Sequence, residues 1–210
     1  MLKIKCFVNE LMSSNCYLVY DEITRQCVII DPASQYSLEE IKFIERNNLS
    51  VDYIILTHEH TDHTWGVNSL LQRFDLKVVC HKECALALNS ESRAYFQFYY
   101  DDPSYEYVIE KIDLLVDENS NIIDWNGRKI NFMYSPGHSK GSMCVKIDNV
   151  LFTGDTIMQY KPYISRKNGS LESFHDSVNC IKDLFLHKDI IVYPGHGESF
   201  CLDDYFCINN

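Results

Sequence analysis

Four side chains of the kinds that bind metal ions fall within six consecutive residues of this 210-residue chain. They are His58, His60, Asp62 and His63, and they directly follow a largely apolar run, Val51 to Leu56. Because the chain has only eight histidines, such a cluster is rare by chance. The alternation of His58 and His60 is typical of an extended segment, which aims both imidazoles toward one side. The cluster therefore predicts a metal site at the end of a buried strand.

Three further segments share this arrangement, a short turn that carries a histidine or an aspartate directly after an expected strand. The three residues are His138 after strand 129–134, Asp155 after strand 150–153, and His196 after strand 190–193. A glycine directly before each of them lets the backbone turn sharply. The seven imidazole and carboxylate groups form a set that suits zinc, iron or manganese. Two ligand groups offset along the chain can hold two metal ions.

The remaining sequence predicts a mixture of strands and helices. Besides the three strands above, β-branched and aromatic runs predict strands at 16–20, 27–31, 51–56, 77–80 and 143–147. Apolar residues spaced by three or four predict helices at 37–48, 67–74 and 171–185. Ser37 and Glu40 have the spacing of a capping box, in which each side chain satisfies a backbone N–H of the other residue.

The chain shows no internal repeat and no linker rich in proline, glycine or serine, which favours a single domain over 1–210. Residues 82–117 are its least regular part, because aromatic side chains are mixed with acids there and Pro103 interrupts the stretch. We expect short helices in this insert. They would form either a lid over the site or an ordinary packing or dimer face.

Composition limits the classes of partner. The chain has 30 acidic and 19 basic residues, a formal charge of −11. Binders of nucleic acid or anionic membranes usually need a basic face, so we expect neither partner. No segment has the length and apolarity of a membrane span. Asn9 and Glu10 interrupt the apolar run that a signal peptide needs, so we expect a cytoplasmic protein.

The nine cysteines do not form a recognisable framework. They are scattered, odd in number and contain no Cys-x-x-Cys pair, so we expect reduced thiols packed as small apolar side chains. Cys80, His81 and Cys84 lack the second pair of ligands that a structural zinc site needs. His175 and His187 are expected at the surface.

The ordered motifs resemble those of the metallo-β-lactamase superfamily, and specifically its glyoxalase II-like hydrolases. The matching segments are Thr57-His58-x-His60-x-Asp62-His63, Gly137-His138-Ser139, Gly154-Asp155-Thr156 and Gly195-His196-Gly197, with Asn15–Val19 and Asp31-Pro32 resembling the opening strands. The resemblance implies an α+β fold of four layers, an αββα sandwich in which two mixed β-sheets are flanked by helices. The metals would lie in a cleft along one edge of the sheets.

The resemblance also implies which residues bind each metal. His58, His60 and His138 would hold the first ion, and Asp62, His63 and His196 the second, with Asp155 bridging the two. A true β-lactamase of this superfamily usually has a cysteine among its second-site ligands. This sequence has Asp155 and His63 instead, so we do not expect lactam hydrolysis.

The expected activity is hydrolysis of a small thioester or ester by hydroxide bound to two divalent metals, most simply zinc. One metal would polarise the substrate carbonyl while the hydroxide attacks. Asp62 is the expected catalytic residue, because it can orient that hydroxide by a hydrogen bond. Two divalent ions, two aspartates and one hydroxide leave the centre near a charge of about +1, which suits an anionic or carbonyl substrate.

The sequence departs from glyoxalase II where that family binds glutathione. The loop at 158–169 lacks the Gly-Cys-Gly-Lys/Arg pattern, and Gly197-Glu198 follows the last ligand histidine. Lys161, Arg166 and Lys167 form a basic cluster in that loop, which either grips a substrate carboxylate or is simply solvated.

Two other activities stay open at this point. Persulfide dioxygenases resemble the same family but use a single iron held by two histidines and an aspartate, and here the set to test would be His58 or His138 with Asp155. A lactonase would share the dizinc centre.

Overall fold

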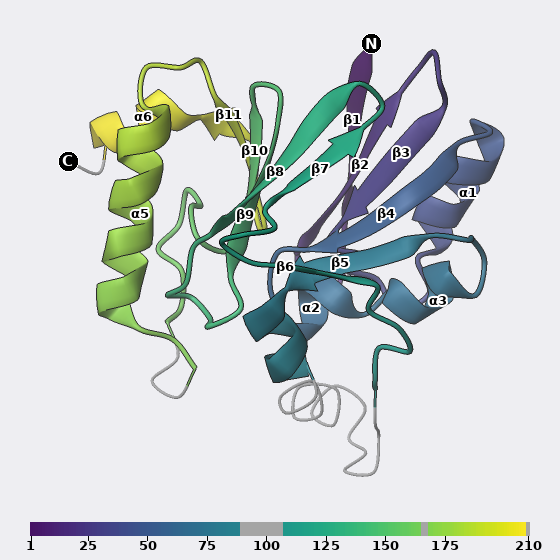
Figure 1. The fold of residues 1–210 in the computed structure, drawn as a ribbon, viewed down its shortest axis with the longest axis horizontal. Helices are drawn as coiled ribbons and strands as arrows, with labels where there is room; N and C mark the ends of the chain where they lie inside the picture. Colours follow the sequence, from purple (N-terminus) through teal and green to yellow (C-terminus); the bar gives the residue numbers. More distant parts are fainter. Residues whose placement is uncertain (89–106, 165–167, 209–210) are drawn as a thin grey trace.

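The apolar runs of the sequence form the inner strands of two β-sheets that lie face to face (Figure 1). The structure, a computed structural model, describes residues 1–88, 107–164 and 168–208. The first sheet has the strand order β1-β2-β3-β4-β5-β6. Its strands are β1 (Leu2–Val8), β2 (Asn15–Asp21), β3 (Gln26–Ile30), β4 (Ser50–Leu56), β5 (Lys77–His81) and β6 (Leu114–Val116). β1 to β3 pair antiparallel, whereas β3 to β6 run parallel.

The second sheet has the order β12-β11-β10-β9-β8-β7. Its strands are β7 (Ile122–Trp125), β8 (Arg128–Tyr134), β9 (Met143–Ile147), β10 (Val150–Gly154), β11 (Ile191–Pro194) and β12 (Phe200–Cys201). β10 and β11 form a parallel pair, and the other neighbouring strands of this sheet are antiparallel. Both sheets are therefore mixed, as the resemblance predicts.

Three apolar cores join four layers. The central core lies between the sheets and includes Val28 of β3 and Phe152 of β10. A second core packs α1 (Leu38–Arg46) and α3 (Val67–Leu71) on the outer face of the first sheet, with Ile44 among its fully buried side chains. A third packs α5 (Leu171–Phe185) and α6 (Leu202–Ile208) on the second sheet. This arrangement, visible in Figure 1, confirms the predicted αββα sandwich.

The predicted helix at 37–48 exists, but the predicted capping box does not. Ser37 has a left-handed backbone, and its side chain makes no cap bond and instead donates to the carbonyl of Ser34 at 3.2 Å. Glu40 does not reach back to Ser37, because it is buried, with 1% of its surface exposed, and its carboxyl contacts Cys16 of β2. Tertiary packing therefore overrides the local motif.

The insert at 82–117 is partly described. Residues 82–88 are helical, as expected, and β6 is a strand that the sequence analysis did not predict. Tyr107 packs against Trp65, and its hydroxyl donates to the carbonyl of Thr64 at 3.0 Å. Residues 89–106, on which the lid hypothesis mainly depends, lie outside the described residues.

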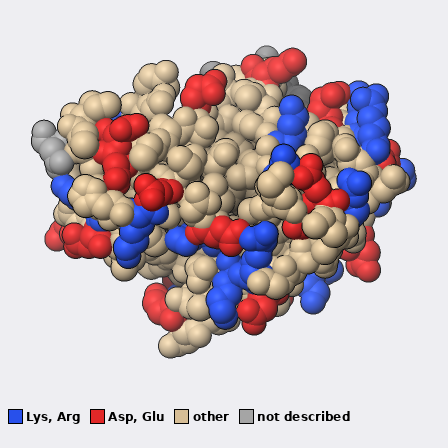
Figure 2. Space-filling view, turned by 90° about the horizontal axis from the view of Figure 1, so that it is seen from above, with Lys and Arg blue, Asp and Glu red and all other residues tan. Residues whose placement is uncertain are grey.

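The surface carries both signs of charge. Figure 2 shows Lys and Arg interspersed with Asp and Glu on one face of the molecule. The expected surface positions of His175 and His187 are confirmed, since both are exposed, and all nine cysteines are free. Within the described ranges, none of the helices has both the length and the apolarity to cross a membrane.

Candidate metal centre

The seven predicted ligand residues lie together at one edge of the two sheets, although they come from four segments of the chain. His58 and His60 follow β4, and Asp62 and His63 belong to α2 (Thr61–Thr64). The other three side chains lie in the second sheet's turns, and they are His138 between β8 and β9, Asp155 after β10, and His196 after β11. The site therefore forms only where both sheets end.

The first group consists of His58, His60 and His138. One nitrogen of each imidazole lies within 4.8 Å of the others. The Nδ1 of His60 is 2.9 Å from the Nε2 of His138, and the ring of His58 lies 4.7 Å from that of His60. Three imidazoles that converge in this way match the coordination habits of zinc and related divalent ions.

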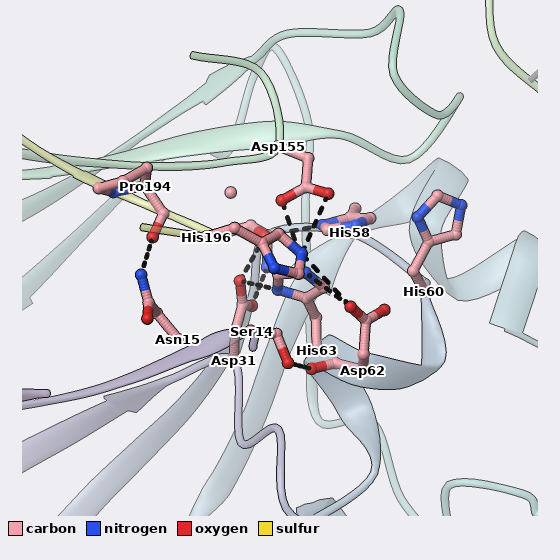
Figure 3. Close-up of polar contacts among 12 residues, drawn as sticks. Ser14, Asn15, Asp31, His58, His60, Asp62, His63, Asp155, Pro194 and His196 are labelled. Atoms are coloured by element: carbon pink, nitrogen blue, oxygen red, sulfur yellow. Dashed lines mark hydrogen bonds and ion pairs between the residues drawn. The ribbon is translucent and has the colours of Figure 1, made fainter. Parts of the chain in front are cut away.

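The second group consists of Asp62, His63 and His196. Their ligand atoms also lie within 4.8 Å of one another. The Oδ2 of Asp62 is 3.6 Å from the Nε2 of His63 and 3.4 Å from the Nε2 of His196. In Figure 3 the two rings lie between the carboxylates of Asp62 and Asp155.

Asp155 lies between the two groups. Its Oδ1 is 3.5 Å from the Nε2 of His63. Its Oδ2 is 3.4 Å from the Nε2 of His138 and 3.6 Å from the Nε2 of His196. One carboxylate thus faces a member of each group, which is the position that a bridging ligand requires.

Four of the histidines use Nδ1 for a hydrogen bond, so that Nε2 faces the centre. The Nδ1 of His138 contacts the carbonyl of Tyr163 at 2.8 Å, and that of His196 contacts the carbonyl of Ser13 at 3.1 Å. Because a carbonyl only accepts, each Nδ1 carries the proton and each Nε2 keeps its lone pair. Such outer contacts fix the ring orientation of metal-binding histidines.

Asp31 and Thr57 orient the other two histidines. Asp31 accepts from the backbone N–H of Thr57 at 2.7 Å and from its hydroxyl at 2.6 Å, and it contacts the Nδ1 of His63 at 3.0 Å. The Thr57 hydroxyl donates to Asp31, so it accepts from the Nδ1 of His58, 3.0 Å away. Asp31 could also be grouped with His58 and His63 as a ligand set, but these bonds already occupy its carboxylate.

Three inward-facing atoms have no hydrogen-bond partner among the described residues. The Nε2 of His58, the Nε2 of His63 and the Oδ1 of Asp155 are buried side-chain atoms without a hydrogen bond. Buried polar atoms are nearly always bonded, so the clustering of these three atoms fits a site that binds a ligand. A divalent cation accepts lone pairs from imidazole and carboxylate, and the donor set therefore fits metal ions.

Burial and charge divide the histidines into two kinds. Burial lowers the pKa of His58 well below its usual value and lowers the pKa of His60 and of His138 to about 4. These three imidazoles are neutral at pH 7, which is the form that binds metal. The neutral state of the first group is thus set by its surroundings.

The second group behaves differently because it contains carboxylates. Burial opposes the protonation of His63, but Asp62, Asp155 and Asp31 outweigh it and raise its pKa to about 10. Burial likewise opposes protonation of His196, and its bond to Asp62 raises the pKa on balance. Burial would raise the pKa of Asp62, but His63 and His196 lower it overall. A metal ion that binds at the Nε2 of His63 would displace the proton held there.

Residues of β2 hold the last ligand turn in place. The side-chain amide of Asn15 donates to the carbonyl of Pro194 at 3.0 Å (Figure 3) and to that of Gly197 at 2.8 Å. The Tyr17 hydroxyl donates to the carbonyl of Pro194 at 2.7 Å. Gly195 permits a close approach, since a Cβ there would lie 2.1 Å from the Oδ1 of Asp155. The sequence pattern did not indicate a site role for Asn15, Tyr17 or Asp31. The signal available for Asp31 was a carboxylate directly after a strand.

The remaining sequence features are the basic residues of the loop at 158–169 and the group Cys80, His81 and Cys84. Lys161 is exposed, and Arg166 and Lys167 lie outside the described residues. Among the residues that the structure describes, Cys80, His81 and Cys84 are not grouped as possible metal ligands. The buried ring of His81 stacks on Tyr134 instead.

Comparison with known proteins defines the class. The metallo-beta-lactamase superfamily profile matches residues 10–196, and the chain belongs to this superfamily, whose members are generally hydrolases. A solved structure described as the BLEG-1 B3 metallo-beta-lactamase superposes with a TM-score of 0.80 at 25% identity, covering 95% of this chain and 94% of that one. ETHE1 from Myxococcus xanthus has a TM-score of 0.69 at 21% identity over 95% of this chain and 79% of its own, and shares the fold.

Three relatives carry a named activity. The chain is 26% identical to Thioesterase pkgB of Emericella nidulans over 90% of this chain and 47% of that protein. It is 26% identical to the probable polyketide biosynthesis zinc-dependent hydrolase PksB of Bacillus subtilis, over 87% of this chain and 72% of that protein. It is 27% identical to the hydroxyacylglutathione hydrolase of Francisella philomiragia, over 90% of this chain and 65% of that protein. The match of the superfamily profile over residues 10–196 confirms the predicted superfamily.

Proposed function

We propose that this protein is a dinuclear metal-dependent hydrolase that cleaves a small thioester or ester. The observation that carries the proposal is the pair of three-residue ligand groups, with Asp155 facing both. The names of the relatives support the same chemistry, because one is a thioesterase and another a zinc-dependent hydrolase.

In this proposal, His58, His60 and His138 would hold one ion, and Asp62, His63 and His196 would hold the other. Asp155, which faces both groups, would complete the ligand set. When bound, the ions, most simply zinc, would lower the pKa of water to about 7 and polarise the acyl carbonyl. No serine or cysteine nucleophile is then required.

The chain's own residues supply orientation. Ser14 donates its hydroxyl to the backbone carbonyl of Asp62 at 2.7 Å, which fixes the start of α2. The Asp62 carboxylate faces the centre with a lowered pKa, so it stays ionised and can accept a hydrogen bond from the attacking water. This is the role we propose for Asp62 as the catalytic residue.

A mononuclear iron dioxygenase would explain less of the site. It would need only two histidines and Asp155, whereas Asp62, His63 and His196 form a complete second group. A dizinc lactonase would use the same residues, and it differs from the proposal only in the substrate.

Activity assays on the purified chain test this function. The metal-loaded protein is offered small acyl thioesters, carboxylic esters and lactones, and a persulfide with oxygen monitoring. We expect thioester or ester hydrolysis that a chelator abolishes and zinc restores. Hydrolysis of lactones alone would show that the substrate is a lactone rather than a small thioester or ester. Oxygen consumption with the persulfide, without hydrolysis, would overturn the proposal.

A further inference from the structure

Glu59 lies between two metal-group histidines in the sequence, and its carboxylate contacts the turn that follows the third. It separates His58 from His60 in the sequence and is buried, with 2% of its surface exposed. Its Oε2 accepts a hydrogen bond from the hydroxyl of Ser139 at 2.8 Å. Ser139 directly follows His138, the third member of the same group. Glu59 adjoins His58 and His60 in the sequence, so its bond to Ser139 links the segment that carries two of the first-group histidines to the turn that carries the third.

The turn that carries Ser139 is shaped to receive this carboxylate. The hydroxyls of Ser139 and Ser142 are 2.9 Å apart, and the backbone N–H of Ser139 donates to the Ser142 hydroxyl at 3.2 Å. A Cβ on Gly141 would lie 2.4 Å from the Glu59 Oε2 and 2.5 Å from the Cα of Cys84. Only glycine leaves room for the carboxylate at this position.

The two segments belong to different sheets. Glu59 follows β4 of the first sheet, whereas Ser139 lies between β8 and β9 of the second. A backbone bond from the N–H of Met143 to the carbonyl of Thr57, at 2.8 Å, joins the same two segments nearby. The distance between His138 and the pair His58 and His60 depends on how these sheet ends are held together.

We propose that Glu59 is a positioning residue that sets the metal affinity of the first group through its bond to Ser139. The inference rests on the proposed metal centre. The second group is held by other contacts, since Ser14 bonds Asp62 and the carbonyl of Ser13 contacts His196. Loss of the Glu59 bond should therefore weaken one metal site and spare the other.

The test measures zinc affinity of metal-free protein in two backgrounds. H196A leaves the first group to be titrated, and H60A leaves the second. In the H196A background we expect Glu59→Ala to weaken zinc binding by about 10- to 100-fold, the usual effect of removing an outer contact. In the H60A background the same substitution should leave the zinc affinity within about twofold, because the outer contacts of the second group stay in place.

Two further variants separate positioning from a general loss of structure. Glu59→Gln keeps an oxygen that accepts from Ser139 and should restore most of the affinity. Ser139→Ala removes the same bond from the other side, so its effect should not add to that of Glu59→Ala. If Glu59→Ala does not fold, Ser139→Ala is titrated with zinc in the same two backgrounds instead. Glu40→Ala is the matched control, because Glu40 is a buried acid in α1; it should leave zinc affinity unchanged.

Equal weakening of both groups by Glu59→Ala, or no weakening of the first, would overturn the inference. Additive effects of Glu59→Ala and Ser139→Ala would also overturn it. Failure of the parent protein to bind divalent metal would instead contradict the proposed function, so the two failures are distinguishable.

Discussion

At the scale of single residues, Asp31 organises two ligands at once. It contacts the Nδ1 of His63 directly and reaches His58 through the Thr57 hydroxyl. Its backbone has a left-handed φ of 54°, which aspartate tolerates better than most residues. The carboxylate therefore lies where two histidines of different metal groups need a partner.

We predict that Asp31→Ala lowers zinc affinity by about 10- to 100-fold, because two ligand rings lose their orientation. The free energy of unfolding should also fall by about 1–3 kcal/mol, since the buried N–H of Thr57 loses its acceptor. Isothermal titration and denaturant unfolding measure the two effects. Asp31→Asn keeps the shape of the side chain, so its zinc affinity and its free energy of unfolding should lie between those of the parent and of Asp31→Ala. An Asp31→Ala variant with parental zinc affinity would contradict this role.

Gly195 matters to the site because a larger side chain would not fit beside the ligands. A Cβ there would meet the Asp155 carboxylate at 2.1 Å and the Cε1 of His63 at 2.8 Å. We predict that Gly195→Ala displaces both ligands and lowers hydrolysis by about 100-fold, as a displacement near 1 Å typically does. Steady-state kinetics checks this.

Gly127 offers the matched control for that substitution. Its φ is +72° and a Cβ would meet nothing within 4 Å. Gly127→Ala should cost about 1 kcal/mol of stability from the left-handed backbone and leave activity unchanged. Equal activity of the Gly195→Ala and Gly127→Ala variants would show that the close approach is unimportant.

At the scale of elements, burial decided which strands the sequence could predict. The eight inner strands, β2 to β5 and β8 to β11, were all predicted from apolar runs. The four strands that were not predicted are β1, β6, β7 and β12, which are the edge strands of the two sheets. An edge strand has fewer covered side chains, so its sequence lacks a continuous apolar run.

For the candidate site, the sequence predicted the ligand residues but not the residues that hold them in place. The seven ligand types and their order were visible because metal binding demands imidazole or carboxylate at strand ends. Asn15 and Ser139 were not assigned a role, because a polar residue beside a strand has many possible uses. Only the packing of one sheet end on the other shows which partner each one reaches.

The start of α5 supports the His138 turn. Ser170 caps this helix by accepting from the N–H of Ser173 at 3.2 Å, and its own N–H donates to the carbonyl of Gly137 at 2.8 Å. Ser177 donates to the carbonyl of Pro136 at 2.7 Å. One helix end therefore fixes the turn before the ligand.

We predict that Ser170→Ala lowers the free energy of unfolding by about 1 kcal/mol, because the cap is lost. The backbone bond to Gly137 survives, so zinc affinity should stay within about twofold of the parent value. Ser173→Ala is the control, because the cap uses only its backbone N–H. Thermal unfolding compares the variants, and equal melting temperatures for both would contradict the cap.

At the scale of the whole molecule, the proposed centre connects the two sheets. His58, His60, Asp62 and His63 come from the first sheet's side, and the other three ligands come from the second. Bound metal would hold the sheet ends together, and the unfolded chain offers no such site.

We therefore predict a large loss of stability on metal removal. Zinc at about 1,000 times its dissociation constant would stabilise the folded chain by about 4 kcal/mol. Dialysis against a chelator should lower the melting temperature, and added zinc should restore it. The His60→Ala, His196→Ala double variant should respond less. A parent melting temperature that is indifferent to chelation would contradict this coupling.

The central claim is that one chain holds two metal ions in two adjacent groups. Elemental analysis of protein purified without added metal tests it most directly. We predict about two divalent ions per chain, most simply zinc, falling to about one in H60A and in H196A. About one iron per chain in the parent protein, unchanged by H196A, would contradict the two-metal centre and point to the mononuclear alternative.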